Sequence, residues 1–366
     1  MGHLERIKEI EFEMSRTQKN KATEYHLGRL KARLAILRGE IMKEQNASKK
    51  GPGEGFDVQR CGDARISMIG FPSVGKSTLL TALTDTVSRA AAHAFTTVTC
   101  IPGVLRYNDV DIQLLDLPGI IEGASGGAGR GRQVIAVGRS SDLILMVLDA
   151  PRASIERRLL TRELYNVGIR LNRQRPDIQI KVNRIGGVKM NSMVQLTHLD
   201  EGLVRDILSM HKIRSAEVLI REDCKVDDLI DVVSSNRRYI PCLYAVNKID
   251  TVTLAEIDRF AHCKHTVVIS GHQRLNLDYM LKAVWEHLSM IRIFTKPKGR
   301  RPDFSDPVIM LRGATVADLC RHIHKDFVKK FRYALVWGTS VKHQPQHCGL
   351  KSVLNDEDVV AIYTYK

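Results

Sequence analysis

The sequence predicts an α/β fold, a parallel sheet with crossover helices, preceded by a pair of N-terminal helices. Three observations predict it. Apolar residues at three-four spacing in residues 1–47 are typical of amphipathic helices. From about residue 63, short apolar strands alternate with helical segments. A glycine-rich loop separates the first strand of this alternation from its first helix.

Residues 1–47 predict two helices folded into a hairpin. Apolar residues recur on both sides of a basic break at Lys19-Asn20-Lys21, namely Leu4, Ile7, Ile10 and Met14 before it and Leu27, Leu30, Leu34, Leu37 and Ile41 after it. We expect these stripes to cover each other or the next domain, and the alternative is a coiled-coil partner outside the chain. Residues 48–62 have the composition of a flexible linker.

The glycine-rich loop runs from Gly70 to Ser77 and fits the pattern G-x-x-x-x-G-K-[ST] at every fixed position. Gly70 and Gly75 let successive backbone N–H groups point at a phosphate chain, and a helix starting near Lys76 adds positive potential. Lys76 can reach the β- and γ-phosphates as a catalytic residue, and the Ser77 hydroxyl can ligate Mg²⁺. A strand-to-helix turn that binds nothing is the alternative. The predicted contacts are Gly70, Phe71, Pro72, Ser73, Val74, Gly75, Lys76, Ser77 and Thr78.

Polar residues stand at the carboxyl ends of later strands, where ligands bind in parallel α/β sheets. We predict strands at residues 112–116, 141–149, 239–246 and 266–270. The first of them ends in a D-x-x-G element, Asp116-Leu117-Pro118-Gly119. Asp116 can hold Mg²⁺ through water, and the Gly119 amide can approach a γ-phosphate as a catalytic group. By itself, such a segment could also be a simple turn.

A second strand-end element, Asn247-Lys248-Ile249-Asp250, predicts which base is bound. The Asp250 carboxylate can accept hydrogen bonds from N1–H and from the exocyclic amino group of guanine, a pairing that adenine cannot supply. ATP would leave this carboxylate unpaired in a closed pocket. Behind a complete phosphate loop, these elements predict a protein that binds GTP and GDP.

A switch threonine is predicted in the polar loop at residues 87–100, which contains Phe95-Thr96-Thr97. A threonine there can close over Mg²⁺ and the γ-phosphate when GTP is bound and let go after hydrolysis. Thr97 is the predicted metal ligand and catalytic residue, with Thr96 as the alternative. The predicted metal set is therefore Ser77, Thr97 and Asp116, and Phe95 and Thr96 are predicted nucleotide contacts.

The composition is that of a globular protein with an unusual charge. The chain has 366 residues, 43% of them hydrophobic and 27% charged, and a net charge of +15. That surplus favours RNA, ribosomes or acidic proteins as partners, with no DNA expected, whereas a solvated basic surface is the alternative. Seven scattered cysteines predict reduced thiols in the cytosol or nucleus, and we expect a cytoplasmic location. No apolar run is long enough to cross a bilayer, so no membrane partner is predicted.

Taken together, the motifs resemble a known family, the developmentally regulated GTP-binding proteins within the Obg-type GTPases. The resemblance covers essentially the whole chain, and residues 221–224 and 268–271 are similar to the second eukaryotic branch. The stretches that carry it are Arg16–Gly28, Gly70–Thr78, Phe95–Gly103, Leu114–Ala124, Gly129–Ala136, Asn247–Asp250 and Tyr333–Thr339.

The resemblance implies four parts. They are a helical hairpin at residues 1–47, a P-loop GTPase domain at 63–165 and 236–290, an inserted α/β segment at 166–235, and a C-terminal TGS domain of β-grasp, ubiquitin-like fold at 291–366. The spacing supports the insert independently, because the 131 residues from Asp116 to Asn247 exceed what a two-strand, two-helix crossover requires.

Local patterns predict elements inside the last two parts. In the insert we expect a hairpin around residues 184–187 and a helix near 200–211. Residues 292–301 carry five basic residues and are expected to precede the last domain. Within that domain the pattern predicts a helix at 316–327 and strands at 308–311, 333–336 and 359–363.

The resemblance also bears on hydrolysis. Many GTPases have a glutamine after D-x-x-G that orients the attacking water, whereas Ile120 stands there in this chain, so slow intrinsic hydrolysis is predicted. Some relatives use K⁺ held partly by an Asn of the phosphate loop, and the corresponding residue here is Ser73, which leaves K⁺ dependence open. The S-A-x loop expected for guanine binding has the form Ser270-Gly271-His272, which keeps the backbone N–H that would contact guanine O6.

The sequence patterns and the resemblance are consistent with two functions. The first is a Mg²⁺-dependent GTPase that acts as a ribosome- or RNA-associated switch in translation or growth control. The second is an RNA- or ribosome-binding adaptor in which bound GTP is structural and hydrolysis incidental. The resemblance further implies a dedicated regulatory protein that binds and stabilises the GTPase.

Overall fold

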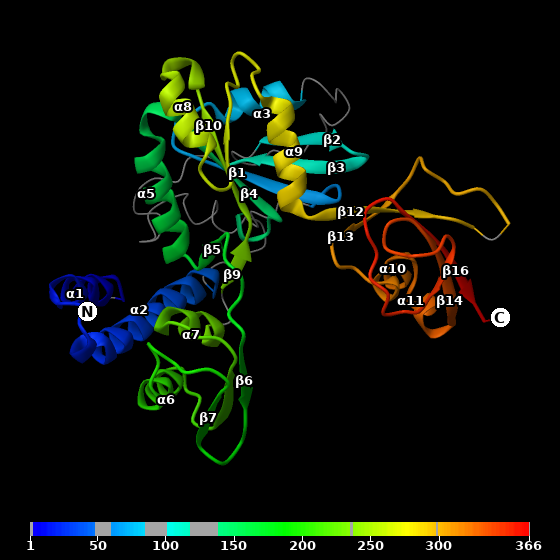
Figure 1. Cartoon of the computed structure of the whole chain (residues 1–366). Coiled ribbons are helices and arrows are strands. Elements are labelled where there is room, and N and C mark those ends of the chain that lie inside the picture. The colour runs from blue at the N-terminus through cyan, green and yellow to red at the C-terminus, as the bar shows by residue number, and fades with distance from the viewer. Residues whose placement is uncertain are drawn as a thin grey trace. The chain divides into compact units, whose positions relative to one another are not determined.

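A computed structural model describes residues 3–47, 60–84, 101–117, 138–234, 237–297 and 299–365 (Figure 1). The chain divides into two compact units. One consists of Met1–Asp57, Ile121–Arg139 and Leu159–Ile240, and the other of Val58–Ile120, Ser140–Arg158 and Pro241–Lys366.

A six-stranded sheet in the second unit has the strand order β11-β10-β4-β1-β3-β2. Neighbouring strands are parallel except β2, which pairs antiparallel with β3. Its strands are β1 (Ala64–Ile69), β2 (Ile101–Tyr107), β3 (Val110–Asp116), β4 (Leu143–Asp149), β10 (Cys242–Asn247) and β11 (Thr266–Val268). Every residue of β1 and β10 is buried, as in strands covered on both faces. The predicted α/β fold with a largely parallel sheet is confirmed.

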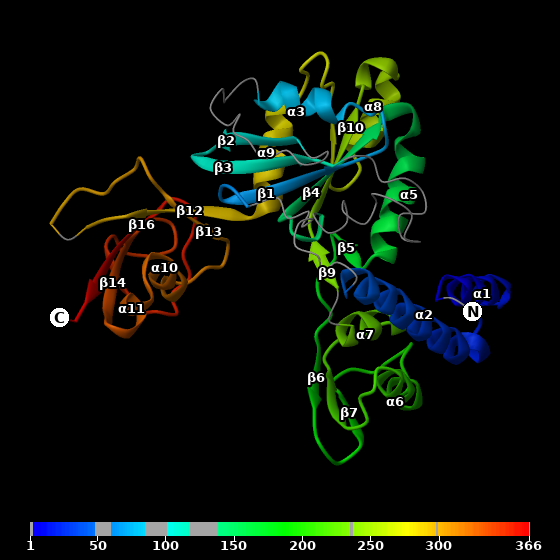
Figure 2. The same cartoon turned by 180° about the vertical axis from the view of Figure 1, so that it is seen from behind.

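Helices α3 (Lys76–Thr84) and α9 (Leu277–Leu288) contribute to one apolar core with this sheet, and they lie next to each other in Figures 1 and 2. The core residues that they supply are Leu79, Leu80, Leu83, Met280, Ala283, Val284 and Leu288. The remaining elements that follow strands of this sheet are η2 (Ala150–Arg152), α5 (Ala153–Asn166), η3 (Ile249–Thr251) and α8 (Leu254–Ala261).

The strand predicted at residues 239–246 is two strands. Residues Arg238–Ile240 form β9, which pairs with β5 (Ile169–Leu171) in a separate two-stranded sheet, and β10 begins only at Cys242. Pro241 stands between them and has no N–H to donate to a ladder, although its carbonyl accepts from the Ile144 amide at 3.0 Å. A proline inside an apolar run therefore marks the change of sheet.

His265, just before β11, is hydrogen-bonded to His287 on α9. His287 Nδ1 lies 2.8 Å from the Ala283 carbonyl oxygen and must donate to it, which leaves His287 Nε2 to accept from His265 Nδ1 at 2.9 Å. Burial lowers the pKa of His265, and electrostatic repulsion from His287, Arg157 and Lys264 lowers it further.

We expect this pair to make the folded chain lose stability as pH falls. Because the pKa of His265 is lower in the folded chain than in the unfolded chain, its contribution is complete above about pH 6.5 and is lost as pH falls through the folded-state value. His265→Asn keeps a donor, suits the backbone φ of 57° and does not titrate. Its urea unfolding midpoint should therefore drop less than that of the wild type between about pH 7.5 and 5.5. The exposed His262→Asn serves as the control, and identical pH profiles for all three proteins would refute the assignment.

In the first unit, α2 (Lys21–Ala47) is covered by other helices of the same unit. α1 (His3–Arg16) packs along one stripe of α2, in a cluster formed by Ile10, Leu30, Leu34 and Leu37. Ala32 faces another core, which it shares with α6 (Glu201–Met210) and α7 (Val226–Val233). Apart from Leu4, which is 48% exposed, the stripe of α1 is thus covered by α2, as the first of the two interpretations expected.

The sheet of the insert is not the hairpin that the sequence predicted. β6 (Ile178–Val182) pairs antiparallel with β8 (Ala216–Ile220), β7 (Val188–Ser192) pairs parallel with β8, and the strand order is β6-β8-β7. The loop at residues 183–187 therefore joins two strands that are not neighbours, and the predicted hairpin is wrong. β8 takes the central place because its alternate residues are fully buried against the core, whereas β6 and β7 are largely exposed.

The C-terminal sheet has the order β13-β12-β16-β14-β15. Its elements are β12 (Met290–Thr295), β13 (Val308–Leu311), α10 (Val316–Ile323), α11 (Lys325–Lys329), β14 (Phe331–Trp337), β15 (Gln346–Cys348) and β16 (Asp358–Thr364). α10 packs on one face of the sheet, over Ala334, Val336 and Val360. Two expectations need correction: residues 292–295 belong to the first strand of this sheet, and the predicted helix at 316–327 is interrupted by the extended backbone of His324.

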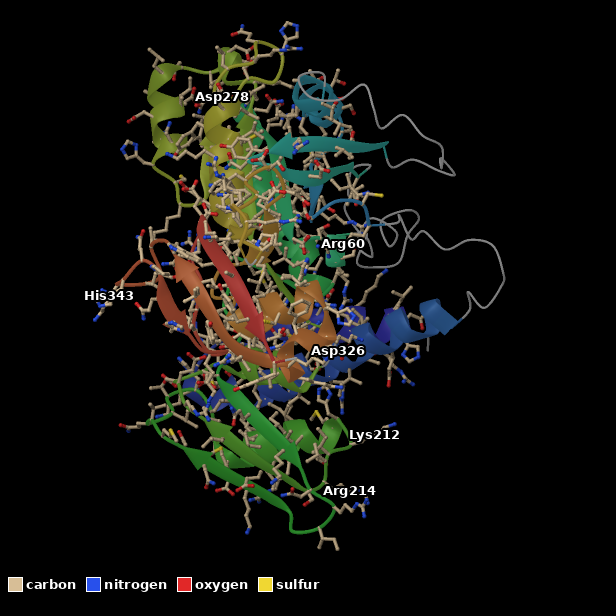
Figure 3. The ribbon with its side chains drawn as sticks, turned by 90° about the vertical axis from the view of Figure 1, so that its right-hand side faces the viewer. Arg60, Lys212, Arg214, Asp278, Asp326 and His343 are labelled. Atoms are coloured by element: carbon tan, nitrogen blue, oxygen red, sulfur yellow. The ribbon has the colours of Figure 1, made fainter. Side chains whose placement is uncertain are left out.

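Figure 3 labels His343, in the loop before β15, and Asp326, on α11. In the part of the chain that the structure describes, no helix has the length and apolar character needed to span a membrane.

Candidate functional site

The candidate site lies where β1, β3, β4 and β10 end, at one edge of the six-stranded sheet. These strands are parallel, so their carboxyl ends carry the phosphate loop, Asp116, Asp149 and Asn247 to the same edge. Asp149 and Asn247 are paired neighbours in the register of β4 and β10. The topology therefore brings the predicted motif residues together.

The phosphate loop needs glycine at two positions. A Cβ at Gly70 would collide with the Val147 carbonyl oxygen, and Gly75 has a φ of +93°. Ser73 also has a positive φ of 64°, so the chain turns sharply before α3 begins at Lys76. The Leu79 amide then donates to the Gly75 carbonyl at 2.9 Å, which closes the first helical turn and leaves the preceding amides free of that helix ladder.

Lys76 is held inside the loop. It is 8% exposed, and its Nζ donates to the carbonyl oxygens of Gly70 at 3.0 Å and Phe71 at 2.9 Å. Burial lowers the pKa of Lys76, whereas the negative charges of Asp116 and Glu156 raise it. The loop thus contains a desolvated cation at its centre, which suits an anionic ligand.

Ser77 and Asp116 form the part of the site that fits a divalent cation. Ser77 Oγ donates to Asp116 Oδ2 at 2.8 Å. The other carboxylate oxygen, Asp116 Oδ1, is buried and has no hydrogen-bond partner among the described residues. A buried carboxylate oxygen without a donor is costly unless something positive is placed beside it, and a hydroxyl with a carboxylate is a typical oxygen set for Mg²⁺.

Asn247 ties the phosphate loop to the loop after β11. It is buried, its Nδ2 donates to the Val74 carbonyl at 2.8 Å, and its Oδ1 accepts from the Gly271 amide at 2.9 Å. The Gly271 N–H, which the sequence had left for guanine O6, is thus already used inside the protein.

Asp250 is exposed, and its carboxylate is oriented by one neighbour. Ser270 Oγ donates to Asp250 Oδ1 at 2.7 Å, and this hydrogen bond lowers the pKa of Asp250. Lys248 has a φ of 62° and its Nζ lies 3.1 Å from Asp149 Oδ1. Lys248 is therefore anchored to the end of β4, while Asp250 presents an ionised carboxylate to solvent.

Five predicted residues lie outside the described residues, namely Phe95, Thr96, Thr97, Pro118 and Gly119. The other predicted residues are described. Pro72, Ser73 and Thr78 are exposed, Phe71 and Ile249 are half-buried, His272 is exposed, and Leu117 is buried behind Asp116, where its amide donates to the Met68 carbonyl at 3.3 Å.

Sequence reasoning missed Asp149 and Glu156. Glu156 Oε2 accepts from the Asp149 amide at 3.0 Å, and burial raises the pKa of Glu156. The available signal was an acidic residue at the end of a buried strand, the same signal that singled out Asp116.

Gly75→Ala is expected to damage the site and the fold together. The new Cβ would collide with Asn247 Nδ2, which donates to Val74, and alanine is strained at a φ of +93°. We expect the free energy of unfolding to fall by roughly 1–3 kcal/mol and affinity for GTP to fall with it. Urea unfolding and titration with a fluorescent GTP analogue measure the two effects.

Gly271→Ala is the matched control for this variant. There the new Cβ would lie 3.5 Å from Asn247 Oδ1, an ordinary contact, and it restores the S-A-x form of the loop. We expect wild-type affinity for GTP. Comparable damage from both substitutions would show that the contact with Asn247 is not the cause.

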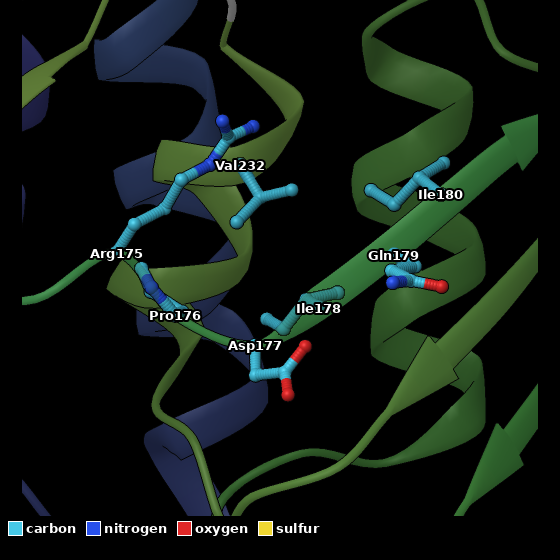
Figure 4. Close-up of a pocket in the computed structure, with 7 residues that line it drawn as sticks. All are labelled: Arg175, Pro176, Asp177, Ile178, Gln179, Ile180 and Val232. Atoms are coloured by element: carbon cyan, nitrogen blue, oxygen red, sulfur yellow. The ribbon is translucent and has the colours of Figure 1, made fainter. Parts of the chain in front are cut away.

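A pocket of about 570 Å³ lies in the first unit and shares no residue with this site. The side chains that line it come from the segment leading into β6, from the start of β6 and from α7, as Figure 4 shows: Arg175, Pro176, Asp177, Ile178, Gln179, Ile180 and Val232. The acid among them, Asp177, already accepts from Arg221 Nη1 at 3.0 Å. The pocket therefore brings no convergent set of reactive groups together.

Comparison with protein families matches the chain in three consecutive stretches. Residues 65–184 match the family described as "50S ribosome-binding GTPase", residues 185–290 match the C-terminal region of that domain, and residues 291–364 match the TGS domain. These matches confirm a P-loop GTPase domain followed by a TGS domain.

Full-length relatives are also found. Developmentally-regulated G-protein 1 of Arabidopsis thaliana is 55% identical over 369 residues, covering 100% of this chain and 92% of the relative. Developmentally-regulated GTP-binding protein 2 of Homo sapiens is 55% identical over 362 residues, covering 99% of each chain. Among solved structures, the YchF GTPase of Schizosaccharomyces pombe matches 83% of this chain and 99% of its own, with a TM-score of 0.49 and 14% identity.

Proposed function

Because this chain belongs to the developmentally regulated GTP-binding proteins, we propose that it hydrolyses GTP slowly in a Mg²⁺-dependent reaction and serves as a ribosome- or RNA-associated switch. The observation that carries the proposal is the set of motif residues gathered at one edge of the six-stranded sheet. Buried Lys76, the Ser77–Asp116 pair with its unpartnered carboxylate oxygen, and the Asn247–Asp250 segment lie at the ends of neighbouring strands.

At the phosphate end of the site, Lys76 is proposed to bind the triphosphate. Its Nζ is held by two loop carbonyls, and we propose that it turns from them to the β- and γ-phosphate oxygens, with which it makes stronger, charge-assisted hydrogen bonds. Ser77 and Asp116 would hold Mg²⁺, Asp116 through water, together with Thr97 of the switch loop. When bound, Mg²⁺ neutralises charge on the phosphate oxygens.

On the base side, the Asp250 carboxylate would select guanine by accepting from N1–H and the exocyclic amino group. Ser270 orients that carboxylate, and its hydrogen bond favours the ionised form. Asn247 is hydrogen-bonded to the phosphate loop and to the loop after β11, and these contacts would fix the positions of Lys76 and Asp250 relative to each other.

Turnover is proposed to be slow because Ile120 stands where many GTPases have a water-orienting glutamine. Backbone groups, a partner or K⁺ would then position the water, and Ser73 is the residue available to K⁺ in the phosphate loop. Comparing the turnover number in KCl and NaCl of equal ionic strength tests this point. Equal rates would remove K⁺ from the proposal.

The partners are proposed from charge and from family. A net charge of +15 suits ribosomes and RNA, and the matched family carries ribosome binding in its description. We further propose a cytoplasmic location and a regulatory protein that binds and stabilises the chain.

Single-turnover hydrolysis with and without ribosomes tests the switch. We expect ribosomes to raise the rate constant of GTP cleavage, because Ile120 stands in place of the glutamine that orients the attacking water in many GTPases. The alternative, an adaptor in which GTP is structural, is favoured by the same Ile120. It would take first place if ribosomes bound the chain and left the rate constant unchanged.

A further inference from the structure

The open face of the C-terminal sheet carries aromatic rings and cations together. Along β14 and β16, Ala334, Val336 and Val360 lie in the core with α10, so Tyr333, Trp337 and Tyr363, which alternate with them, face the other way. We define the aromatic-basic face as Tyr333, Trp337 and Tyr363, together with His347 of β15 and with Lys296 and Arg332, whose cations lie over the Trp337 and Tyr333 rings. Each of these six residues is half-buried or exposed.

Three rings of this face form a row across three strands. Tyr333 is the cross-strand partner of Tyr363, and their rings are stacked with centroids 4.7 Å apart and planes 16° apart. On the other side, the His347 ring on β15 lies 4.7 Å from that of Tyr333. A row of partly exposed rings on an open sheet offers flat π surfaces to a ligand.

Two cations lie against these rings. Lys296 Nζ is 4.6 Å from the centroid of the Trp337 ring, and Arg332 Cζ is 5.6 Å from that of Tyr333. Neither forms an ion pair with a carboxylate among the described residues, whereas Arg292 on the same sheet pairs with Asp356 at 2.9 Å. The charges of Lys296 and Arg332 are therefore available to an anion.

The surrounding domain has the same sign of charge. Residues 291–366 contain 14 Lys and Arg against 7 Asp and Glu, a net charge of +7. A stable cross-strand aromatic pair alone would account for Tyr333 and Tyr363. It would not account for two uncompensated cations beside the rings or for the basic surplus of the domain.

We propose that the aromatic-basic face binds single-stranded RNA. Unpaired bases stack on aromatic side chains regardless of sequence, and Lys and Arg beside the rings contact the phosphates. An acidic peptide would match the cations but leave the rings unused, and a duplex keeps its bases stacked inside. This inference rests on the proposed association with RNA and assigns that association to one surface.

The test uses the full chain and fluorescein-labelled oligouridylate of about 12 nucleotides in a fluorescence anisotropy titration, because that length covers an open sheet face. Tyr333→Ala is expected to weaken binding by about 10-fold, and Tyr333→Phe, which keeps the stack, to leave it unchanged. Lys296→Gln should reduce the slope of log affinity against log salt by about 0.7. The control is Tyr279→Ala on α9, a 57% exposed tyrosine outside this domain, which should bind as the wild type does.

A second readout does not depend on truncating the sheet. The chain has two tryptophans, so in Trp285→Phe the tryptophan fluorescence comes from Trp337 alone. A base that stacks on this face should quench it, and a duplex of the same length should not. Tyr365→Ala, at a 61% exposed ring beside Arg332, supplies a variant with little risk to the core and should also bind more weakly.

Three results would overturn the inference: equal RNA affinity for Tyr333→Ala and Tyr279→Ala, equal affinity for single strand and duplex, or preference for polyglutamate over RNA. Each variant is also titrated with a fluorescent GTP analogue. If Tyr333→Ala and Tyr279→Ala bound RNA equally well and GTP normally, RNA binding at this face would be refuted and the proposed GTPase function would stand. Loss of GTP binding by the wild type would refute the proposed function itself.

Discussion

Lys76→Met is expected to abolish tight binding of GTP while leaving the fold intact. Lys76 is the buried cation of the phosphate loop, and methionine keeps its apolar stem but cannot donate to phosphate oxygens. Loss of charge-assisted hydrogen bonds worth 1.5–3 kcal/mol each predicts an affinity for Mg²⁺–GTP about 100-fold lower. Titration with a fluorescent GTP analogue measures the change.

Thermal unfolding separates this effect from damage to the fold. GTP should raise the Tm of the wild type by mass action and leave the Tm of Lys76→Met unchanged. Lys282→Met, at an exposed lysine on α9, is the control and should respond to GTP as the wild type does. A Lys76→Met variant that GTP still stabilised would show that the loop does not hold the triphosphate.

Asp250→Asn is expected to change which base is bound. The asparagine oxygen can still accept one hydrogen bond, but its amide meets the exocyclic amino group of guanine donor to donor. Affinity for GTP should fall by about 100-fold, because a donor of guanine is left unpaired. Xanthine carries a carbonyl oxygen where guanine carries that amino group, so affinity for XTP should rise. Competition of GTP, XTP and ATP against one labelled nucleotide gives the three affinities.

The matched control for this variant is Asp278→Asn, at an exposed aspartate of α9 labelled in Figure 3. It removes the same charge without touching Asn247 or Ser270, so its nucleotide preference should stay that of the wild type. If Asp250→Asn still preferred GTP to XTP by the wild-type ratio, Asp250 would not be the residue that selects guanine.

The elements of the fold could be predicted wherever a local pattern determines them. Three-four spacing placed α1 and α2, and apolar runs placed β3 and β4 to within two residues. Strand partnership could not be predicted in this way. β8 enters between β6 and β7 because its buried residues complete a core with α6 and α7, a contact between segments distant in sequence. Nothing in the loop at residues 183–187 reveals that interruption.

The same division applies to the candidate site. The positions of Lys76, Asp116 and Asp250 at one edge of the sheet could be predicted because each belongs to a short motif at a strand end. The hydrogen bonds of Asn247 to Val74 and Gly271, and the ion pair of Lys248 with Asp149, could not, because they join segments that meet only in the folded sheet. Residues that bind a ligand leave a local signal more often than residues that hold the loops in position.

The hydrogen bond between Asn247 and Val74 joins residues 173 positions apart. During synthesis, the segment with the phosphate loop leaves the ribosome long before Asn247, and the whole insert is made in between. A nascent chain that ends before β10 consequently lacks the side chain that fastens this loop, together with Asp250, the residue proposed to select the base. Nucleotide loading must therefore wait until most of the polypeptide has emerged, and a prematurely terminated product would carry the Gly70–Ser77 motif without a working site.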